Sequence, residues 1–392
     1  MSTSGFTPSC SKTRERLPRS KSQKTVKPSA RASYPCARTG GRDVSRLRDD
    51  EGISWRGGLG TDPGNTRRRR SDKVGARVRR NFLATAHRGR PDRPRPSLTR
   101  AATPVWRQGH AVQDTLRPDR LIAGVTTAEG EKAIRAVYAP ILDAGVPIFV
   151  TDPQTAELAK GAANTFLGLK ISYINAVADM CQAAGGDVSQ IVEILGIDPR
   201  IGSGGMMPGI GYGGGCLPKD VRASTASARQ LGATRAADLL RAAEKINEDR
   251  TAVAMNLIRD ALGDRPVTGA KITVWGAAFK PGTNDVRESP ALALAHALQQ
   301  AGATVTVHDP QAVATAMTRN PELDYTDDLA ESVDGADLVV LATEWPDYQQ
   351  ADPQALLNRP ANPLLVDCRT TLDPEPWCTA GWTIHQLGRP GK

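Results

Sequence analysis

The sequence is poor in cysteine and has no long hydrophobic run. Its 392 residues include six cysteines, and none of them forms a CxxC pair or stands at a zinc-like spacing from a histidine. No apolar run approaches the roughly 18 residues that a membrane-spanning helix needs, and no apolar segment near the N-terminus is typical of a signal peptide. We therefore expect free thiols, no metal site, no membrane partner and a cytoplasmic protein.

The net charge of +9 is confined to one end of the chain. The first 100 residues contain 26 Lys and Arg against 8 Asp and Glu, whereas the rest contains 25 basic and 34 acidic residues. Residues 1–106 are rich in Arg, Ser and Pro and lack apolar periodicity, which predicts disorder. Aromatic residues are few among these charges and no nucleic-acid-binding module is recognised, so we do not expect a nucleic-acid partner. A transit peptide and a solvated leader are the alternatives.

Residues 107–151 show a strand, helix, strand pattern. Strands are expected at 120–125 and 146–151, with a helical stretch over 128–145 between them. Asp152 suits an N-cap and Pro153 a first helical position, and no breaker follows until about Gly185. A long central helix from 152 to 184 is therefore predicted.

This helix carries apolar residues around much of its circumference, so we expect it to be buried at the centre of the molecule, as core or as a dimer interface. The stripe consists of Leu158, Ala162, Phe166, Leu169, Tyr173, Ala176 and Met180.

A second α/β pattern occupies the C-terminal third. Strands are expected at 271–276, 304–308, 336–342 and 363–367, and Ser289 and Pro290 open a helix that Gly302 closes. Alternating strands and helices predict the α/β class, with a doubly wound parallel sheet. The predicted parts are a disordered segment (1–106), a short α/β segment (107–151), a central helical domain (152–264) and a C-terminal α/β domain (265–392).

A glycine-rich segment, Gly-Tyr-Gly-Gly-Gly-Cys-Leu-Pro-Lys-Asp, ends at Asp220. Glycines allow a backbone to approach a ligand closely, and the lone Cys216 at the end of the loop, beside Lys219, could be a nucleophile. The alternative for a single cysteine is a small buried hydrophobe.

This segment resembles the catalytic cysteine loop of the UDP-glucose/GDP-mannose dehydrogenase family. Three further segments match that family in order: Ala-Glu-Leu-Ala-Lys-Gly-Ala-Ala-Asn (156–164), Arg-Ile-Gly (200–202), and the stretch from Gly276 to Ser289. The resemblance covers about residues 107–388. It implies that residues 107–151 are a remnant of the NAD-binding domain and that residues 265–392 form the domain that binds the UDP-sugar. It implies NAD-dependent oxidation of UDP-glucose to UDP-glucuronate by a homodimer. UDP-N-acetylmannosamine or GDP-mannose as the substrate, and a non-catalytic nucleotide-sugar-binding remnant, remain alternatives.

The resemblance also implies catalytic roles for four residues. Cys216 would attack the C6 aldehyde formed by a first hydride transfer, and the thioester left by the second would be hydrolysed. Lys160 and Asn164, four residues apart on one helix face, would stabilise developing negative charge, and Asp220 would orient water.

Binding residues are carried over in the same way. Lys219 and Arg287 would contact NAD. The implied contacts to the nucleotide sugar are Arg200, Met207, Pro208, Gly209, Ile210, Gly211, Tyr212, Gly213, Phe279, Lys280 and Arg369, the last reaching the substrate of a neighbouring subunit.

The sequence departs from the family at its start. A strand, a GxGxxG turn and a helix should hold the pyrophosphate, but the glycines at 57–60 lack a preceding strand, and Pro104 stands where a catalytic Glu is expected. We therefore expect the NAD-binding domain to be largely missing or replaced, with a leader read from the wrong frame. The polypeptide as written should bind UDP-glucose weakly, hardly bind NAD, and show no steady-state dehydrogenase activity.

Overall fold

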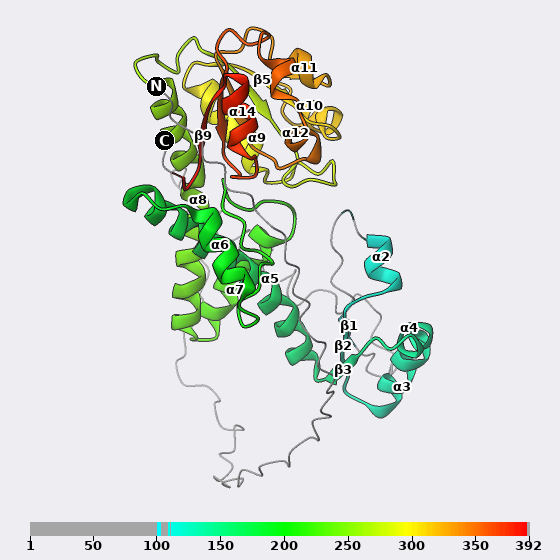
Figure 1. The fold of residues 1–392 in the computed structure, drawn as a ribbon. Coiled ribbons are helices and arrows are strands. Elements are labelled where there is room, and N and C mark those ends of the chain that lie inside the picture. The colour runs from blue at the N-terminus through cyan, green and yellow to red at the C-terminus, as the bar shows by residue number, and fades with distance from the viewer. Residues whose placement is uncertain (1–99, 103–108, 110, 390–392) are drawn as a thin grey trace, which may run out of the picture. The chain divides into compact units, whose positions relative to one another are not determined.

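A computed structural model describes residues 100–102, 109 and 111–389 (Figure 1). The predictions made for the basic segment, for the glycines at 57–60 and for Pro104 lie outside these residues. Within the described part of the chain, no helix is long and apolar enough to span a membrane.

The first sheet has three strands and includes the predicted strand, helix, strand unit. Strand β2 runs parallel to β3 and antiparallel to β1. The predicted helical stretch is divided into two helices at Tyr138, because Pro140 lacks an N–H and disfavours helical geometry before it. The elements are β1 (Arg100–Ala102), α2 (Ala111–Leu116), β2 (Leu121–Gly124), α3 (Ala128–Val137), α4 (Ala139–Asp143) and β3 (Ile148–Thr151).

The long central helix is confirmed as α5. Its N-cap, Asp152, accepts a hydrogen bond of 2.8 Å from the backbone N–H of Thr155, and Gly185 ends the helix with a positive φ of 76°. Three more helices follow. The central elements are α5 (Pro153–Ala184), α6 (Val188–Ile197), α7 (Leu217–Gln230) and α8 (Thr234–Leu262).

The face that α5 buries consists mainly of small residues, which corrects the expectation that its apolar stripe forms the core of the single chain; the alternative of a dimer interface stays a prediction. A Cβ on Gly168 would lie 3.1 Å from Val221 on α7, and the hydroxyl of Ser172 donates to the carbonyl of Ala243 on α8 at 2.7 Å. Small residues let the helix backbones approach closely, so the bulky side chains point away. Four members of the stripe are more than half exposed in the single chain: Leu158, Phe166, Tyr173 and Met180.

The C-terminal domain is a doubly wound, six-stranded parallel sheet in the order β6-β5-β4-β7-β8-β9, which confirms the predicted fold class. The sequence did not predict β6 and β9. The elements are β4 (Lys271–Trp275), α9 (Pro290–Gln300), β5 (Thr304–His308), α10 (Val313–Arg319), β6 (Asp324–Thr326), α11 (Leu329–Ser332), β7 (Leu338–Leu341), α12 (Pro346–Gln349), α13 (Pro353–Leu356), β8 (Leu364–Asp367), α14 (Pro374–Ala380) and β9 (Thr383–Gln386).

Large aromatic side chains fill the core of this sheet domain. Trp275 at the end of β4 is fully buried and stacks on Tyr348 with 5.1 Å between ring centroids. Trp377 meets Trp275 edge to face at 6.1 Å. Central strands β7 and β8 are buried along their whole length, as expected for a parallel sheet covered on both faces.

Candidate active site

Cys216 lies at the N-cap of α7, at the end of the glycine-rich loop, and it is exposed. Pro218 occupies the first turn of the helix, where a missing N–H is tolerated, and the N–H of Asp220 donates to the carbonyl of Cys216 at 2.9 Å. A helix N-terminus favours negative charge that develops on a group bound there, so the position suits a nucleophile that attacks a carbonyl carbon.

Asp220 connects this helix to α5. Its carboxylate accepts a hydrogen bond of 2.6 Å from the side-chain amide of Asn164 and pairs with Lys219 at 2.8 Å. Asn164 is 8% exposed, whereas Lys160, one turn earlier on α5, is exposed. The structure therefore joins the predicted amide and carboxylate, 56 residues apart in sequence, and leaves the predicted lysine at the solvent edge of the same helix.

The glycines of the loop allow the sheet domain to approach. Gly213 lies so close to Glu288 that an added Cβ would be 2.0 Å from its carbonyl oxygen. At Gly214, with a φ of 81°, an added Cβ would be 2.8 Å from the ring of Phe279. Phe279, a predicted substrate contact, is thus packed directly on the cysteine loop; a side chain at Gly214 would displace its ring, and one at Gly213 would clash with the backbone of Glu288.

Arg287, a predicted cofactor contact, lies next to Cys216. A Cβ on Gly215 would be 2.6 Å from the guanidinium of Arg287. Hydrogen bonds to Asp285, the shortest of 2.6 Å, fix this guanidinium and raise its pKa, and the neighbouring Cys216 adds to the effect. The cation is half-exposed, so it can face both a ligand and solvent.

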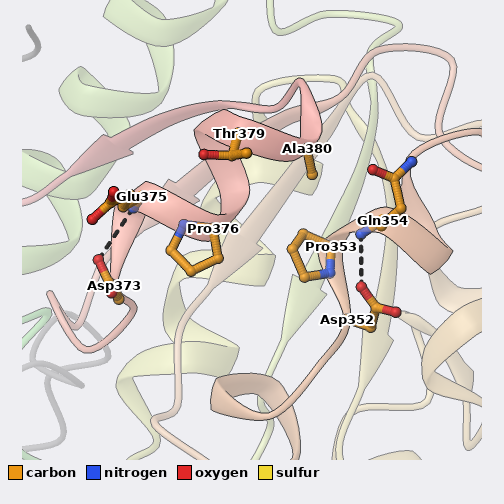
Figure 2. A pocket seen from close by; sticks show the side chains of 8 residues that line it. All are labelled: Asp352, Pro353, Gln354, Asp373, Glu375, Pro376, Thr379 and Ala380. Carbon is orange, nitrogen blue, oxygen red and sulfur yellow. Dashed lines mark hydrogen bonds between the residues drawn. The ribbon is translucent and has the colours of Figure 1, made fainter.

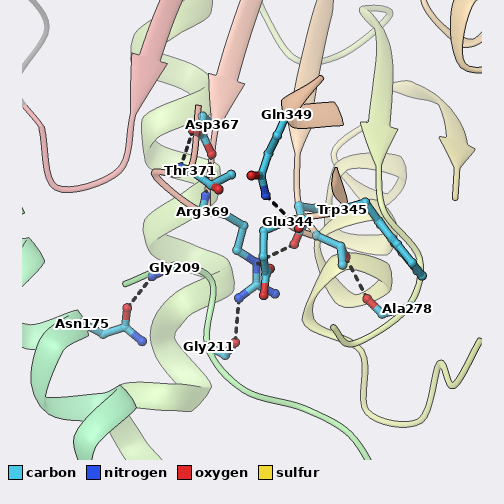
Figure 3. A network of polar contacts seen from close by, with 12 residues as sticks. Asn175, Gly209, Gly211, Ala278, Glu344, Trp345, Gln349, Asp367, Arg369 and Thr371 are labelled. Carbon is cyan, nitrogen blue, oxygen red and sulfur yellow. Dashed lines mark hydrogen bonds and ion pairs between the residues drawn. The ribbon is translucent and has the colours of Figure 1, made fainter. Parts of the chain in front are cut away.

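Arg369 lies over the loop of its own chain (Figure 3). It donates to the carbonyl of Gly211 at 3.2 Å and to that of Ala342 at 2.7 Å, and its side chain packs on Gly209. The role in a neighbouring subunit stays a prediction.

The remaining predicted substrate contacts divide into two groups. Pro208 through Gly213 are buried between the helices and the sheet domain, whereas Met207 is exposed. Lys280 lies 5.9 Å from the centroid of the Phe279 ring. Arg200 is not brought to the loop: its guanidinium pairs with Asp198 at 2.5 Å and is 87% exposed.

Two features of the site were not predicted. Arg222 on α7 makes a bidentate ion pair with Glu288, at 3.0 and 2.7 Å, beside a cavity of about 280 Å³ that Tyr212 also lines. Glu288 has a positive φ of 46°, which is rare for a residue with a side chain. The ion pair therefore holds a strained turn next to Arg287, and no local sequence pattern signals it.

Asp309 was also missed, although an acidic residue directly after β5 is a recognisable signal. Its buried carboxylate accepts the N–H groups of Ala277 and Ala278 at 2.8 and 2.9 Å. These amides follow β4, where a dinucleotide-binding sheet would place its pyrophosphate. The domain's own carboxylate therefore occupies that position.

The described residues do not fit a complete NAD site. The first strand-to-helix turn of the sheet domain is filled by Asp309, and in the small sheet the turn after β2 is closed by Thr127, whose hydroxyl accepts the N–H of Gly130 at 3.1 Å. Only Lys219 and Arg287 remain as contacts of the kind the family implies.

A second, open cleft of about 510 Å³ lies between α13 and α14 (Figure 2). Two of its acidic residues, Asp352 and Asp373, already cap the short helices by accepting backbone N–H groups at 2.9 and 3.1 Å. No predicted site residue lines it.

The fold and the site define an α/β protein in which a parallel sheet domain closes over a cysteine loop carried by a helical domain. Residues 154–249 match the central domain of the UDP-glucose/GDP-mannose dehydrogenase family, and residues 273–374 match its UDP-binding domain. The chain belongs to this family.

Relatives agree with this assignment. The chain is 38% identical over 290 residues to a UDP-glucose 6-dehydrogenase of Pseudomonas aeruginosa, covering 72% of this chain and 63% of that protein. It is 36% identical over 301 residues to a UDP-glucose 6-dehydrogenase of Rhizobium meliloti, covering 76% of this chain and 68% of that protein. It thus spans somewhat less than two thirds of the Pseudomonas protein.

Solved structures show the same fold. A UDP-glucose dehydrogenase from Pyrobaculum islandicum superposes with a TM-score of 0.64 at 32% identity, covering 71% of this chain and 61% of that one. A UDP-D-ManNAc dehydrogenase from Pyrococcus horikoshii gives a TM-score of 0.63 at 27% identity, covering 74% and 64%.

Proposed function

We propose that this chain carries the nucleotide-sugar half of an NAD-dependent UDP-glucose 6-dehydrogenase, with Cys216 as the covalent nucleophile. The observation that carries the proposal is the position of Cys216 at the start of α7, one helical turn before an Asp220 that is already paired with Asn164. The thiol and the carboxylate lie at the N-terminus of α7, and the amide of α5 lies beside them. Together these groups can bind an acyl group, hydrate it and release it.

In the proposed reaction, the Sγ of Cys216 adds to the C6 aldehyde carbon of the sugar, and the thiol proton passes to the carbonyl oxygen. NAD would supply the hydride acceptor, both for forming the aldehyde and for converting the thiohemiacetal to a thioester. Water then adds to the thioester carbon, and the C–S bond breaks to return the thiolate and release the acid. The covalent bond retains the reactive aldehyde between the two oxidations.

Asp220 and Asn164 serve the hydrolysis in this proposal. Asp220 orients the water and takes its proton, and Asn164 fixes that carboxylate through the 2.6 Å hydrogen bond. Lys160 lies one turn away on the exposed side of α5, from which its long side chain can reach a developing oxyanion.

The proposed ligands follow from the same comparison. UDP-glucose is the proposed substrate, because relatives named for it are 36–38% identical, against 27% for the solved UDP-D-ManNAc dehydrogenase. Another UDP-sugar is the second candidate. A homodimer is proposed because the apolar face of α5 is exposed in the single chain.

The experiment tests covalent capture without a cofactor. The purified chain is incubated with the 6-aldehyde of UDP-glucose and then with iodoacetamide, and alkylation of each cysteine is followed by peptide mass spectrometry. The aldehyde should protect Cys216 and leave the exposed, distant Cys378 unprotected. Equal alkylation of Cys216 with and without saturating aldehyde would refute the proposal, and the 6-aldehyde of UDP-N-acetylmannosamine, tested in parallel, decides between the two sugars.

A further inference from the structure

The backbone of the cysteine loop is held at Gly209 by side chains from two helices. Asn175 on α5 accepts the N–H of Gly209 at 2.8 Å, and Arg250 on α8 donates to the carbonyl of Gly209 at 3.0 Å. Both side chains are buried, with at most 1% exposure. The two peptide groups that flank Gly209 are therefore fixed from opposite helices.

Asn247, one turn before Arg250 on the same face of α8, holds the loop a second time. Its side-chain oxygen accepts the N–H of Tyr212 at 2.8 Å, and its amide nitrogen donates to the carbonyl of Tyr212 at 3.1 Å. Gly211 lies between the two fixed points with a φ of 94°, and a Cβ there would be 2.6 Å from the Asn247 oxygen. Only a glycine at position 211 therefore allows the loop to lie this close to Asn247.

Burial of these polar side chains has an unfavourable free energy, which a purely structural role does not explain. Arg250 is 1% exposed, and its ion pair with Asp179 is made at 2.6 Å to a carboxylate that is nearly half-exposed. Within the described part of the chain, the side-chain amide nitrogen of Asn175 and one guanidinium nitrogen of Arg250 find no hydrogen-bond partner. Well-packed apolar residues generally stabilise a core better than such a group, so its geometry requires another explanation.

We propose that Arg250, Asn247 and Asn175 are positioning residues that set the place of Cys216. From Tyr212 the chain reaches Cys216 through three glycines, which have no side chains of their own and on which the sheet domain packs, with the N–H of Gly214 donating to the carbonyl of Arg287 at 2.8 Å. The side chains of α5 and α8 therefore determine where this glycine segment begins and how the thiol meets the N-terminus of α7. This inference rests on the proposed function only in taking Cys216 as the reactive group.

The test measures the alkylation rate of Cys216 by iodoacetamide relative to that of Cys378 in the same full-length chain, near neutral pH and without any sugar. In Arg250→Met the ratio should fall about threefold or more, because a loosened loop no longer holds the thiol in its exposed position at the N-terminus of α7. Arg250→Lys should restore at least half of it, since lysine can also donate to the carbonyl of Gly209.

Arg259→Met is the matched control, because Arg259 lies on the same helix and its guanidinium donates to Asn256 at 2.9 Å. This variant should keep the wild-type ratio. An unchanged or higher ratio in Arg250→Met with an unchanged melting midpoint would overturn the proposal. If Arg250→Met does not fold, Asn247→Asp decides, because it keeps the acceptor for Tyr212 and loses the donor: a lower ratio supports the proposal and an unchanged one overturns it.

Because no sugar is present, this result is independent of the aldehyde-protection experiment. A wild-type chain that the aldehyde fails to protect refutes the proposed function, while a normal ratio in these variants refutes the positioning role.

Discussion

The sheet domain and the central helices bury side chains of opposite size. The sheet domain places its largest side chains inside, with Trp275, Tyr348 and Trp377 all buried. The helices bury small residues such as Gly168 and Ser172 and leave large apolar ones exposed. The sheet domain thus has an aromatic core of its own, whereas the exposed apolar face of the helices is the basis for the proposed homodimer.

The two regions also have different roles in the proposed function: the helices carry the reactive groups, and the sheet domain covers them. The helices supply the cysteine, the amide and the carboxylate. Their backbones approach closely because a glycine of α5, Gly168, packs against Val221 of α7. The sheet domain supplies the surface that closes over the loop, through Phe279 and Arg287. Substitutions in the two regions should therefore affect different properties of the protein.

The largest expected effect is chemical and falls in the helical region. When a complete cofactor domain is supplied by fusion, Cys216→Ala should lower UDP-glucuronate formation by about a thousandfold or more, because the proposed acyl intermediate is bonded to the sulfur of Cys216. NADH release and acid formation are both measured. Normal output of NADH with UDP-glucose would contradict the nucleophilic role.

The next effect is on the stability of the sheet domain. Trp275→Ala should lower its free energy of unfolding by about 3–5 kcal/mol, because the side chain is fully buried and stacked. Urea unfolding followed by tryptophan fluorescence measures the loss. A decrease below about 1 kcal/mol, within the range of ordinary surface changes, would mean that the aromatic core does not carry the domain.

A smaller effect is expected on association. Phe166 and Tyr173 are seven residues apart on the exposed face of α5 and are 62% and 58% exposed. Changing both to Glu should raise the dimer dissociation constant about a hundredfold or more, since two apolar anchors are replaced by charges. Sedimentation of the chain measures it. Leu239→Glu, at a 57% exposed position on α8, is the control that should leave association unchanged.

The smallest effect is a pH dependence confined to the sheet domain. Burial lowers the pKa of His308 from its ordinary value of 6.5, so the folded domain holds a neutral ring against Tyr348. The unfolded chain then binds more protons below pH 6.5, and stability present above that pH is lost as the pH falls towards the folded pKa. Urea midpoints across this range should fall less in His308→Asn. An equal slope in both proteins would contradict the assignment.

The sequence predicted most of the regular structure because local signals were strong. Asp152 and Ser289 cap α5 and α9 as expected, and β5 has the predicted bounds. Of the two alternatives for the apolar stripe of α5, a core of the single chain was wrong, because hydrophobicity does not reveal which face has the small residues that permit close packing; the dimer interface stays a prediction. Strands β6 and β9 were missed because they are short edge strands with few buried residues.

The site was predicted by resemblance more than by pattern. Cys216 stands out in its loop, but nothing local joins Asn164 to Asp220, or brings Asn247 and Arg250 to the loop backbone. Such contacts depend on tertiary packing across dozens of residues. The contact of Asp309 also depends on tertiary packing, because its carboxylate accepts the N–H of Ala277, which lies 32 residues earlier in the sequence.

The most direct test of the central claim is calorimetric titration of the full chain with UDP-glucose and, separately, with NAD. The account predicts weak but saturable heat with UDP-glucose and none with NAD, because the turns that could cradle a pyrophosphate in the described residues are closed by Asp309 and Thr127. NAD binding with a dissociation constant of about 1 μM, roughly 8 kcal/mol of binding free energy, would contradict it.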